Sequence, residues 1–416
     1  MIIKHMEGEI YMERGVDPDK YICHRCSNDV KRYFYKYHSA YHGMDIVYCL
    51  KCVSIGRSDS VTPLRAIQTA KKPEACRYHL DFELTEAQQA ASDRIVKALF
   101  AHSDMLLYAV TGAGKTEIVF EAISLARRQG MNVAFVSPRI DVVKEVHLRL
   151  SGAFRDSDID LLYTGVKETF EHRFTVCTVQ QLYNYIDHFG LIIVDETDAF
   201  PMSSDRQLLN AVRRAAAASS TTVLMTATPN RSMIEFAGEE NVVTLTRRYH
   251  GHDLAIPKVV WQGIAKDVNR RRLPAGLEGL IAGILEKGRR VLVFVPEISL
   301  MEKLQPLVAE KFPGADSVYS GDEQRYGKVD SMRSGRARVL LTTTILERGV
   351  TFKNLDVIVV GAETFNSDSL VQICGRTGRK KDDPVGNIWF MAAYNTGHIR
   401  RTIRIIKKFN AGRAAL

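Results

Sequence analysis

Short apolar runs alternate with longer stretches of mixed polarity from about residue 79 to the end of the chain. Each run is a few residues long and is bounded by turn-forming or charged residues, which is typical of parallel β-strands buried on both faces of a sheet. The stretches between them, such as residues 117–129, have the length and polarity of crossover helices. The predicted strands span residues 105–110, 132–137, 191–194, 222–226, 290–295, 337–342, 357–360 and 387–390.

This alternation predicts an α/β protein with two tandem doubly wound lobes, because a parallel sheet needs crossover helices on its faces. Residues 246–257 are rich in charge, His, Gly and Pro and predict a hinge. We therefore expect a first lobe at residues 79–245 and a second lobe at residues 258–416. Residues 1–78 hold most of the cysteines and many tyrosines, and they predict a small zinc-ribbon-like domain.

A glycine-containing loop joins the first predicted strand to the helix after it. Small residues let backbone N–H groups approach phosphates, while a following lysine reaches the β- and γ-phosphates and a hydroxyl binds Mg²⁺. The sequence therefore predicts an ATP site here, although Ala109 replaces the first glycine of the strict pattern. The residues assigned to ATP are Gly112, Ala113, Gly114, Lys115 and Thr116, and Thr116 is also assigned to Mg²⁺.

Two acidic residues, Asp195 and Glu196, directly follow the predicted strand at residues 191–194. Ligands of open α/β sheets bind at the carboxyl ends of the strands, so both side chains are expected near the nucleotide. We expect Asp195 to hold Mg²⁺ and Glu196 to act as the general base that positions the attacking water. Gln88 is expected to read the edge of the adenine.

The second predicted lobe contributes a basic segment at residues 372–379. Arginines stabilise the charge that develops on a transferring phosphoryl group, so Arg376 and Arg379 are expected to take part in catalysis. Because they are three positions apart, they would share one face of a helix. Gln372 is expected to contact ATP. Thr226 and Thr228 belong to a segment expected to couple the nucleotide state to nucleic-acid binding.

The cysteines of the N-terminal region form two C-x2-C pairs. Each pair places two thiolates on one tight turn, and two pairs make a tetrahedral site for structural zinc. Between them, residues 31–38 interleave aromatic and basic side chains, which suits stacking on single-stranded nucleic acid and equally suits a hairpin whose aromatics fill a small core. Strand alternation would place Tyr33, Tyr35 and Tyr37 opposite Phe34 and Lys36. The four expected zinc ligands are Cys23, Cys26, Cys49 and Cys52.

The net charge of the chain indicates which kind of molecule it binds. The 416 residues are 45% hydrophobic and 25% charged, with a formal net charge of +9. Such a chain typically binds a polyanion, either nucleic acid or an anionic membrane face, although solubility alone would also explain the excess. Residues at predicted strand ends are candidates for contacts to a DNA backbone, namely Arg139, Thr164, Thr178 and Thr344.

The C-terminal tail from residue 399 predicts a helix with one apolar face and a basic remainder. The helix would pack on the second lobe or contact anionic lipid or DNA. No apolar run approaches the ~18 residues of a membrane-spanning helix, and the N-terminus lacks the apolar core of a signal peptide. We therefore expect a cytoplasmic protein. The residues expected on the apolar face of the tail are Ile399, Ile403, Ile406 and Phe409.

Residues 80–416 resemble the superfamily-two helicases through the phosphate loop, the acids at residues 195–198 and the segments at residues 342–351 and 372–379. With its N-terminal cysteines and the run at residues 195–201, the whole chain resembles the ComFA family of late competence proteins. The resemblance implies two RecA-like lobes and an ATP-driven single-stranded DNA translocase or helicase that imports transforming DNA. It also implies Mg²⁺, structural zinc, a ComFC-like partner and a position at the inner face of the membrane, beside the DNA-uptake channel.

Two alternatives use the same motifs. A replication-restart helicase of the PriA type also joins cysteines to helicase lobes, but it carries the cysteine cluster inside the second lobe. A nucleic-acid clamp would use ATP to change its grip without translocating.

Overall fold

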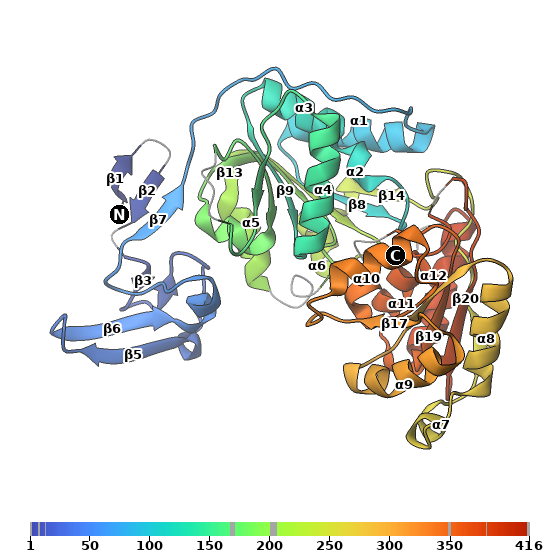
Figure 1. The fold of residues 1–416 in the computed structure, drawn as a ribbon. Coiled ribbons are helices and arrows are strands. Elements are labelled where there is room, and N and C mark those ends of the chain that lie inside the picture. Colours follow the sequence, from blue (N-terminus) through green and yellow to red (C-terminus); the bar gives the residue numbers. More distant parts are fainter. Residues whose placement is uncertain are drawn as a thin grey trace. The chain divides into compact units, whose positions relative to one another are not determined.

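The computed structural model describes residues 2–6, 9–12, 14–166, 171–199, 206–347, 351–379 and 381–413. It divides into two compact units (Figure 1). The first comprises residues 1–107 and 115–243, and the second comprises residues 108–114 and 244–416. No helix in the described ranges is long and apolar enough to cross a membrane.

A seven-stranded sheet forms the centre of the first unit, in the order β10-β11-β9-β12-β13-β8-β14. Its elements are α1 (Glu86–Ala101), β8 (Met105–Ala109), α2 (Lys115–Ile118), α3 (Phe120–Arg128), β9 (Asn132–Ser137), α4 (Ile140–Ala153), β10 (Asp160–Leu162), β11 (Phe174–Thr178), the 3-10 helix η3 (Val179–Asn184), β12 (Phe189–Val194), α5 (Arg206–Ala215), β13 (Ala216–Thr226), α6 (Arg231–Ala237), η4 (Glu239–Asn241) and β14 (Val242–Leu245).

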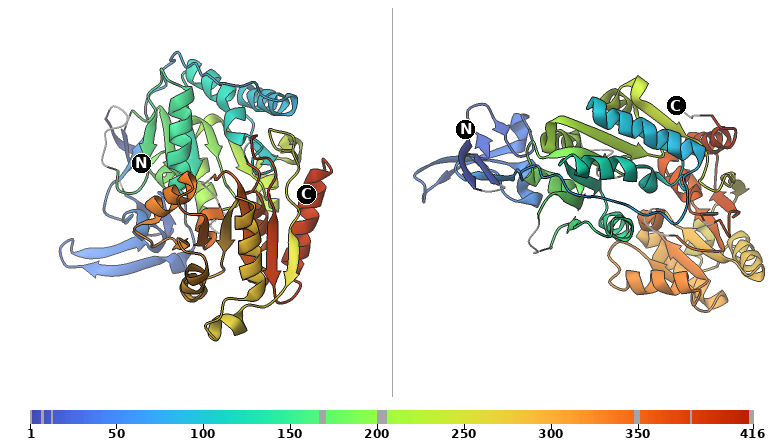
Figure 2. Two further views of the ribbon diagram at one scale, coloured as in Figure 1. Left: turned by 45° about the vertical axis from the view of Figure 1, so that its right-hand side comes forward. Right: turned by 90° about the horizontal axis from the view of Figure 1, so that it is seen from above.

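The central strands of this sheet are parallel and fully buried, which explains their uninterrupted apolar sequences. The chain moves in one direction along the sheet from β8 to β10 and in the other from β10 to β14. Right-handed crossovers therefore place α3 and α4 on one face and η3 and α5 on the other (Figures 1 and 2).

The second unit contains a six-stranded sheet in the order β15-β20-β19-β16-β18-β17, and every strand pair in it is parallel. The same handedness places α8 and α9 on one face and α10 and α11 on the other. Its elements are β15 (Lys258–Trp261), α7 (Ala265–Asn269), α8 (Ala275–Glu286), β16 (Arg290–Phe294), α9 (Ile298–Lys311), β17 (Asp316–Val318), α10 (Arg325–Ser334), β18 (Val339–Thr342), η5 (Thr344–Glu347), β19 (Leu355–Val360), η6 (Ala362–Thr364), α11 (Ser367–Cys374), β20 (Ile388–Ala392) and α12 (Gly397–Asn410).

The N-terminal region packs on the first unit's sheet. Its cysteines and Val16 share one hydrophobic core with Leu208 and Val212 of α5. Ile67 forms a parallel bridge with Tyr185, which ties β7 to the segment before β12. The elements are β1 (Ile2–Met6), β2 (Glu9–Met12), β3 (Val16–Asp17), β4 (Ile22–Cys23), η1 (Lys31–Tyr33), β5 (Phe34–Ser39), β6 (Met44–Cys49), η2 (Leu50–Ile55) and β7 (Leu64–Ile67).

The two predicted doubly wound lobes and the preceding four-cysteine region are confirmed. Three local expectations are wrong. Tyr33 lies in the 3-10 helix η1, so only residues 34–39 alternate as a strand. The helix expected at residues 117–129 is broken into α2 and α3 at Val119. On α12, Thr402 and Ile405 are buried while Ile403 is only half-buried, because the contact stripe follows positions 399, 402, 405, 406 and 409.

Candidate nucleotide and metal sites

The predicted phosphate loop is a tight turn between β8 and α2. Gly112 and Gly114 have φ values of 84° and 73°, in the left-handed region that strains any residue with a side chain. Lys115 and Thr116 then begin α2, and Thr116 is buried. The local backbone therefore has the strand–turn–helix form in which N–H groups can approach a phosphate.

The acidic end of β12 is held in place by its neighbours. The backbone N–H of Asp195 donates to the Val136 carbonyl of β9 (2.8 Å), and the Asp195 carboxylate accepts from the Glu196 N–H (2.8 Å). Asp195 is only 8% exposed. A hydroxyl and a carboxylate are the hard oxygen ligands that Mg²⁺ prefers, so Thr116 and Asp195 are a suitable pair to hold this ion.

Asp198, two positions after Glu196, joins the acidic motif to the segment after β13. Its two carboxylate oxygens accept from the Thr226 hydroxyl (2.8 Å) and from the Thr228 hydroxyl (2.7 Å). The Thr228 N–H in turn donates to the Thr226 hydroxyl (3.0 Å). From the sequence we expected Thr226 and Thr228 to have a coupling role but assigned none to Asp198. An acid and two hydroxyls that follow neighbouring strands could have indicated that these three side chains meet.

Gln88 occupies a helix cap. Its side-chain oxygen accepts from the backbone N–H (2.9 Å) and the hydroxyl (3.0 Å) of Thr85, the N-cap residue of α1. Gln88 is 4% exposed rather than lying on the surface. A bidentate contact to adenine would require this oxygen to leave the cap, so adenine reading by Gln88 stays a prediction.

The basic segment of the second unit differs from the sequence expectation. Helix α11 ends at Cys374, so Arg376 and Arg379 lie in the turn beyond it and do not share a helical face. Gly378, with φ of 59°, keeps the backbone before Arg379 out of a helical conformation. Gln372 and Arg376 are each 3% exposed. The Arg379 Nε donates to the Gly375 carbonyl (3.0 Å).

Arg248, in the segment predicted as a hinge, holds this turn and was missed. It is 4% exposed, and burial lowers its pKa to about 10. Its Nη1 donates to the Gly378 carbonyl (2.6 Å), and the His250 Nε2 donates to the same oxygen (3.0 Å). The Tyr249 hydroxyl donates to the Arg379 carbonyl (3.3 Å). Charge in a linker ordinarily indicates solvent exposure, so no local pattern indicates that Arg248 is buried against this turn.

Three of the proposed DNA-backbone contacts share one edge of the first sheet. Arg139 follows β9, Thr164 follows β10, and Thr178 ends β11. Because these strands are parallel neighbours, their carboxyl ends meet at one edge. Thr344 begins η5 after β18 in the second unit. Residues 200–201 and 348–350 of the helicase-like motifs lie outside the described residues.

The four N-terminal cysteines meet the requirements of a zinc site. Their sulfur atoms all lie within 4.8 Å of one another, and each cysteine is buried. The Cys23–Cys52 and Cys26–Cys49 sulfur pairs are both 3.7 Å apart. Zinc–sulfur bonds of ~2.3 Å in a tetrahedron place the sulfurs ~3.8 Å apart. The cluster therefore has the size and donor set for structural zinc, with no position left over for catalysis.

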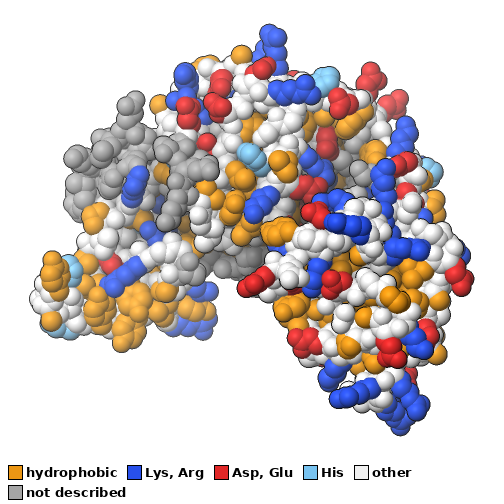
Figure 3. All heavy atoms as spheres, viewed as in Figure 1, with side chains coloured by type: hydrophobic (Ala, Val, Ile, Leu, Met, Phe, Trp, Pro, Cys, Tyr) orange, Lys and Arg blue, Asp and Glu red, His pale blue; other side chains and the backbone are white. Residues whose placement is uncertain are grey.

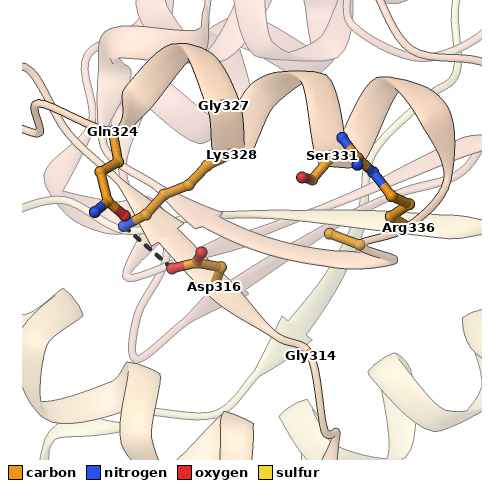
Figure 4. A pocket seen from close by; sticks show the side chains of 8 residues that line it. Gly314, Asp316, Gln324, Gly327, Lys328, Ser331 and Arg336 are labelled. Atoms are coloured by element: carbon orange, nitrogen blue, oxygen red, sulfur yellow. Dashed lines mark ion pairs between the residues drawn. The ribbon is translucent and has the colours of Figure 1, made fainter.

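A separate polar cavity of about 670 Å³ lies between β17 and α10 (Figure 4). Lys328 enters it but is already paired with Asp316 (3.2 Å) and Asp322 (2.9 Å). Its charge is therefore compensated inside the protein, and we assign no function to this cavity.

Comparison with known proteins identifies the two lobes. The family described as "Type III restriction enzyme, res subunit" matches residues 81–231, and "Helicase conserved C-terminal domain" matches residues 276–381. The structure of S. cerevisiae Dbp5 bound to RNA and ADP BeF3 superposes with a TM-score of 0.55 at 15% identity, over 79% of this chain and 92% of that chain. Together with the two parallel sheets, these matches define an ATP-dependent helicase.

The N-terminal region specifies the family further. Residues 1–66 match "Competence protein ComFA N-terminal domain". Competence protein ComFA of Bacillus subtilis (strain 168) is 35% identical, covering 99% of this chain and 90% of that protein. ComFA of Streptococcus pneumoniae (strain ATCC BAA-255 / R6) is 33% identical, covering 94% and 90%. The chain belongs to the ComFA family, which sets aside the PriA-type alternative.

Proposed function

We propose that this protein is an ATP-dependent translocase on single-stranded DNA that drives the import of transforming DNA during competence. Support for the cellular role comes from its relatives, which are named as competence proteins. Support for the motor comes from two helicase domains and from the arrangement of the first unit.

The observation that carries this proposal is the contact of Asp198 with Thr226 and Thr228. It connects the acidic motif of the nucleotide site to the end of β13 through two short hydrogen bonds. A change at Glu196 on hydrolysis would therefore move Asp198, two residues away, and with it Thr226 and Thr228 at the end of a different strand. Such a link is what a motor needs in order to convert nucleotide state into a change of grip.

We assign the chemistry as follows. Lys115 and the loop from Gly112 to Gly114 bind the phosphates of ATP, and Glu196 accepts a proton from the attacking water. Arg376 and Arg379 stabilise the negative charge that develops on the transferring phosphoryl group. Mg²⁺, held by Thr116 and Asp195, would neutralise phosphate charge when bound.

ATP turnover as a function of DNA length tests this proposal. A translocase is stimulated more by longer single strands, because each binding event supports more steps, whereas a clamp saturates at one site size. Lys115→Ala should abolish turnover at every length, while Lys97→Ala, which changes an exposed lysine of α1, should not. Stimulation that stops rising beyond one site size would support the clamp and contradict translocation.

By family, we further propose a ComFC-like partner and a position beside the membrane DNA-uptake channel. Co-purification of the full-length protein with each candidate, before and after nuclease treatment, tests for direct contact. Loss of both partners after nuclease treatment would show that only DNA connects them.

A further inference from the structure

One face of the β5–β6 hairpin carries tyrosines that the protein core does not use. Tyr35 pairs with Tyr48 and Tyr37 pairs with Ile46, so these four side chains share a face. The Tyr48 ring lies 5.6 Å from the Tyr35 ring and 6.2 Å from the Tyr37 ring. Tyr35 is 53% exposed.

Phe34 supplies the packing that the hairpin needs. It lies on the opposite face, where its ring meets Tyr21 edge-on at 5.7 Å and packs against the core that contains the cysteines. The alternative in which the aromatics of residues 31–38 only fill a core therefore holds for Phe34 and fails for Tyr35. On this face Tyr35 is exposed beside the half-buried rings of Tyr37 and Tyr48, and Ile46 is buried. An apolar surface of this kind, rimmed by polar groups, is typical of a binding site.

Basic side chains are fixed among these rings. The Arg57 guanidinium lies over the rings of Tyr37 (5.4 Å) and Tyr48 (5.1 Å). Its Nη2 donates to the Tyr37 hydroxyl (2.7 Å), and its Nε pairs with Asp59 (2.7 Å). Near the start of β5, Lys51 and Arg32 lie 4.4 and 4.9 Å from the Tyr33 ring.

Basic side chains outnumber acidic ones around the hairpin. Figure 3 shows apolar side chains over the hairpin with Lys and Arg side chains beside them. A polyanion with flat apolar groups fits both features. Lys31, Arg32, Lys51 and Arg57 are the basic residues near the tyrosines, and Arg57 is paired with Asp59. Lys36 lies on the opposite face of the hairpin, where it pairs with Asp45.

We propose that this hairpin face is a stacking platform for single-stranded DNA. Unpaired bases stack on Tyr35 and its neighbours, while Arg57 and the adjacent lysines contact the phosphates. A duplex cannot use the platform, because its base faces are covered by the stack. The inference rests on the proposed function. It adds a second DNA contact, separate from the proposed contacts at the strand ends of the two sheets.

The test measures binding by the full-length protein without nucleotide, using fluorescence anisotropy. One probe is a labelled thymidine oligonucleotide of about 20 residues, long enough for one site. The other is an abasic strand of the same length, which keeps the phosphates and lacks the bases. We expect Tyr35→Ala to weaken thymidine binding about tenfold and to leave abasic binding unchanged. Tyr35→Phe should retain the affinity of the parent protein, because it keeps the ring.

A matched control is Tyr326→Ala on α10. Tyr326 is 56% exposed, close to the 53% of Tyr35, and the Arg325 guanidinium lies 4.8 Å from its ring centre. Its replacement should change neither affinity. If Tyr35→Ala binds thymidine as tightly as the parent, or weakens both probes equally, the platform is wrong while the motor still stands. If the parent protein itself fails to bind single-stranded DNA, both the platform and the proposed function are wrong.

Discussion

Glu196 combines backbone strain with a central position at the end of β12. Its φ of 55° lies in the left-handed region, which costs a non-glycine residue on the order of 1–3 kcal/mol. The neighbouring Asp195 carboxylate accepts the Glu196 N–H and so helps to hold this conformation. Strain that the surroundings maintain is typical of a residue whose direction matters for chemistry.

Glu196→Gln should leave ATP binding intact and slow hydrolysis by roughly 10²- to 10⁴-fold, because the amide cannot accept the proton of the attacking water. Binding is checked with a fluorescent ATP analogue and turnover with phosphate release. Glu83→Gln, an exposed change, is the control. Turnover within a factor of two of the parent would remove Glu196 as the base.

The hydrogen bonds of Asp198 should carry coupling rather than chemistry. Thr226→Val keeps the side-chain shape and removes the hydroxyl that donates to Asp198. We expect basal ATP turnover to persist while stimulation by single-stranded DNA falls several-fold. Thr228→Val should have the same effect, and the double variant should be less than additive because both threonines act through one carboxylate. Full DNA stimulation in the double variant would contradict this role.

At the scale of residues, the sequence predicts the roles of side chains that directly follow a buried strand. Lys115, Asp195 and Glu196 follow apolar runs, and the runs are readable because both faces of the sheet are buried. Arg248 is different. Its role depends on reaching Gly378, 130 positions later in the chain, and no local pattern encodes that contact.

At the scale of elements, the strand β7 and the segment after it are fastened to the first unit by His188. The His188 Nδ1 accepts from the Thr69 N–H (3.0 Å), and its Nε2 donates to the His172 carbonyl (2.6 Å). Only the neutral ring can do both. Burial lowers the pKa of His188 and that of His172 to about 4. Burial raises the pKa of Asp160, whose carboxylate accepts the His172 N–H, to about 6.

These shifts predict a pH-dependent stability. Between pH 4 and 6.5 the unfolded chain binds more protons at the two histidines than the folded chain does, so stability rises with pH. Asp160 acts in the opposite direction between its ordinary pKa and about 6, because there the folded chain holds the extra proton. Two histidines outweigh one carboxyl, so the net free energy of unfolding should fall as pH drops from 6.5 to 4.

Urea unfolding at several pH values measures this slope. Protonation of His188 alone should lower the free energy of unfolding by about 3 kcal/mol once the residue is fully titrated. His188→Asn keeps an acceptor for the Thr69 N–H and removes the titration, so it should flatten the profile. A slope equal to that of the parent would show that His188 does not titrate as proposed.

Element boundaries were harder to predict than element types. The long buried strands β9, β12 and β16 were found. The three-residue edge strands β10 and β17 were not, because three residues carry too little pattern, and the buried strand β11 was not among the predicted strands either. Helix α11 was expected to extend to Arg379 because of the three-residue spacing of Arg376 and Arg379. The glycines directly before these arginines, at positions 375 and 378, were not taken into account. Tertiary contacts, rather than local preference, decide these ends.

At the scale of the whole molecule, the zinc cluster is part of the first unit's core. The four cysteines share a continuous apolar cluster with α5 residues such as Leu208 and Val212. Arg214 of α5 is half-buried and donates to the carbonyls of Tyr183 (2.8 Å) and Tyr185 (2.9 Å). Desolvation lowers its pKa to about 10. Loss of the metal should therefore destabilise the first unit, not only the N-terminal region.

Cys52→Ser should remove bound zinc and lower the unfolding midpoint of the first unit by roughly 5–10 °C, since each kcal/mol is worth about 2–4 °C in a unit of this size. Elemental analysis counts the metal and calorimetry gives the midpoint. Cys177→Ala changes a buried cysteine that is not one of the four zinc ligands, so this variant should keep the zinc. A parent protein that carries no zinc would contradict the structural site.

The central claim is that ATP hydrolysis serves movement on single-stranded DNA. Steady-state ATP turnover at one fixed salt concentration, with no nucleic acid, single-stranded DNA, duplex DNA or single-stranded RNA, tests it most directly. We expect strong stimulation by single-stranded DNA, little by duplex or RNA, and none in Lys115→Ala. Equal or greater stimulation by RNA, or no stimulation by any of the three, would contradict the proposed DNA-import motor.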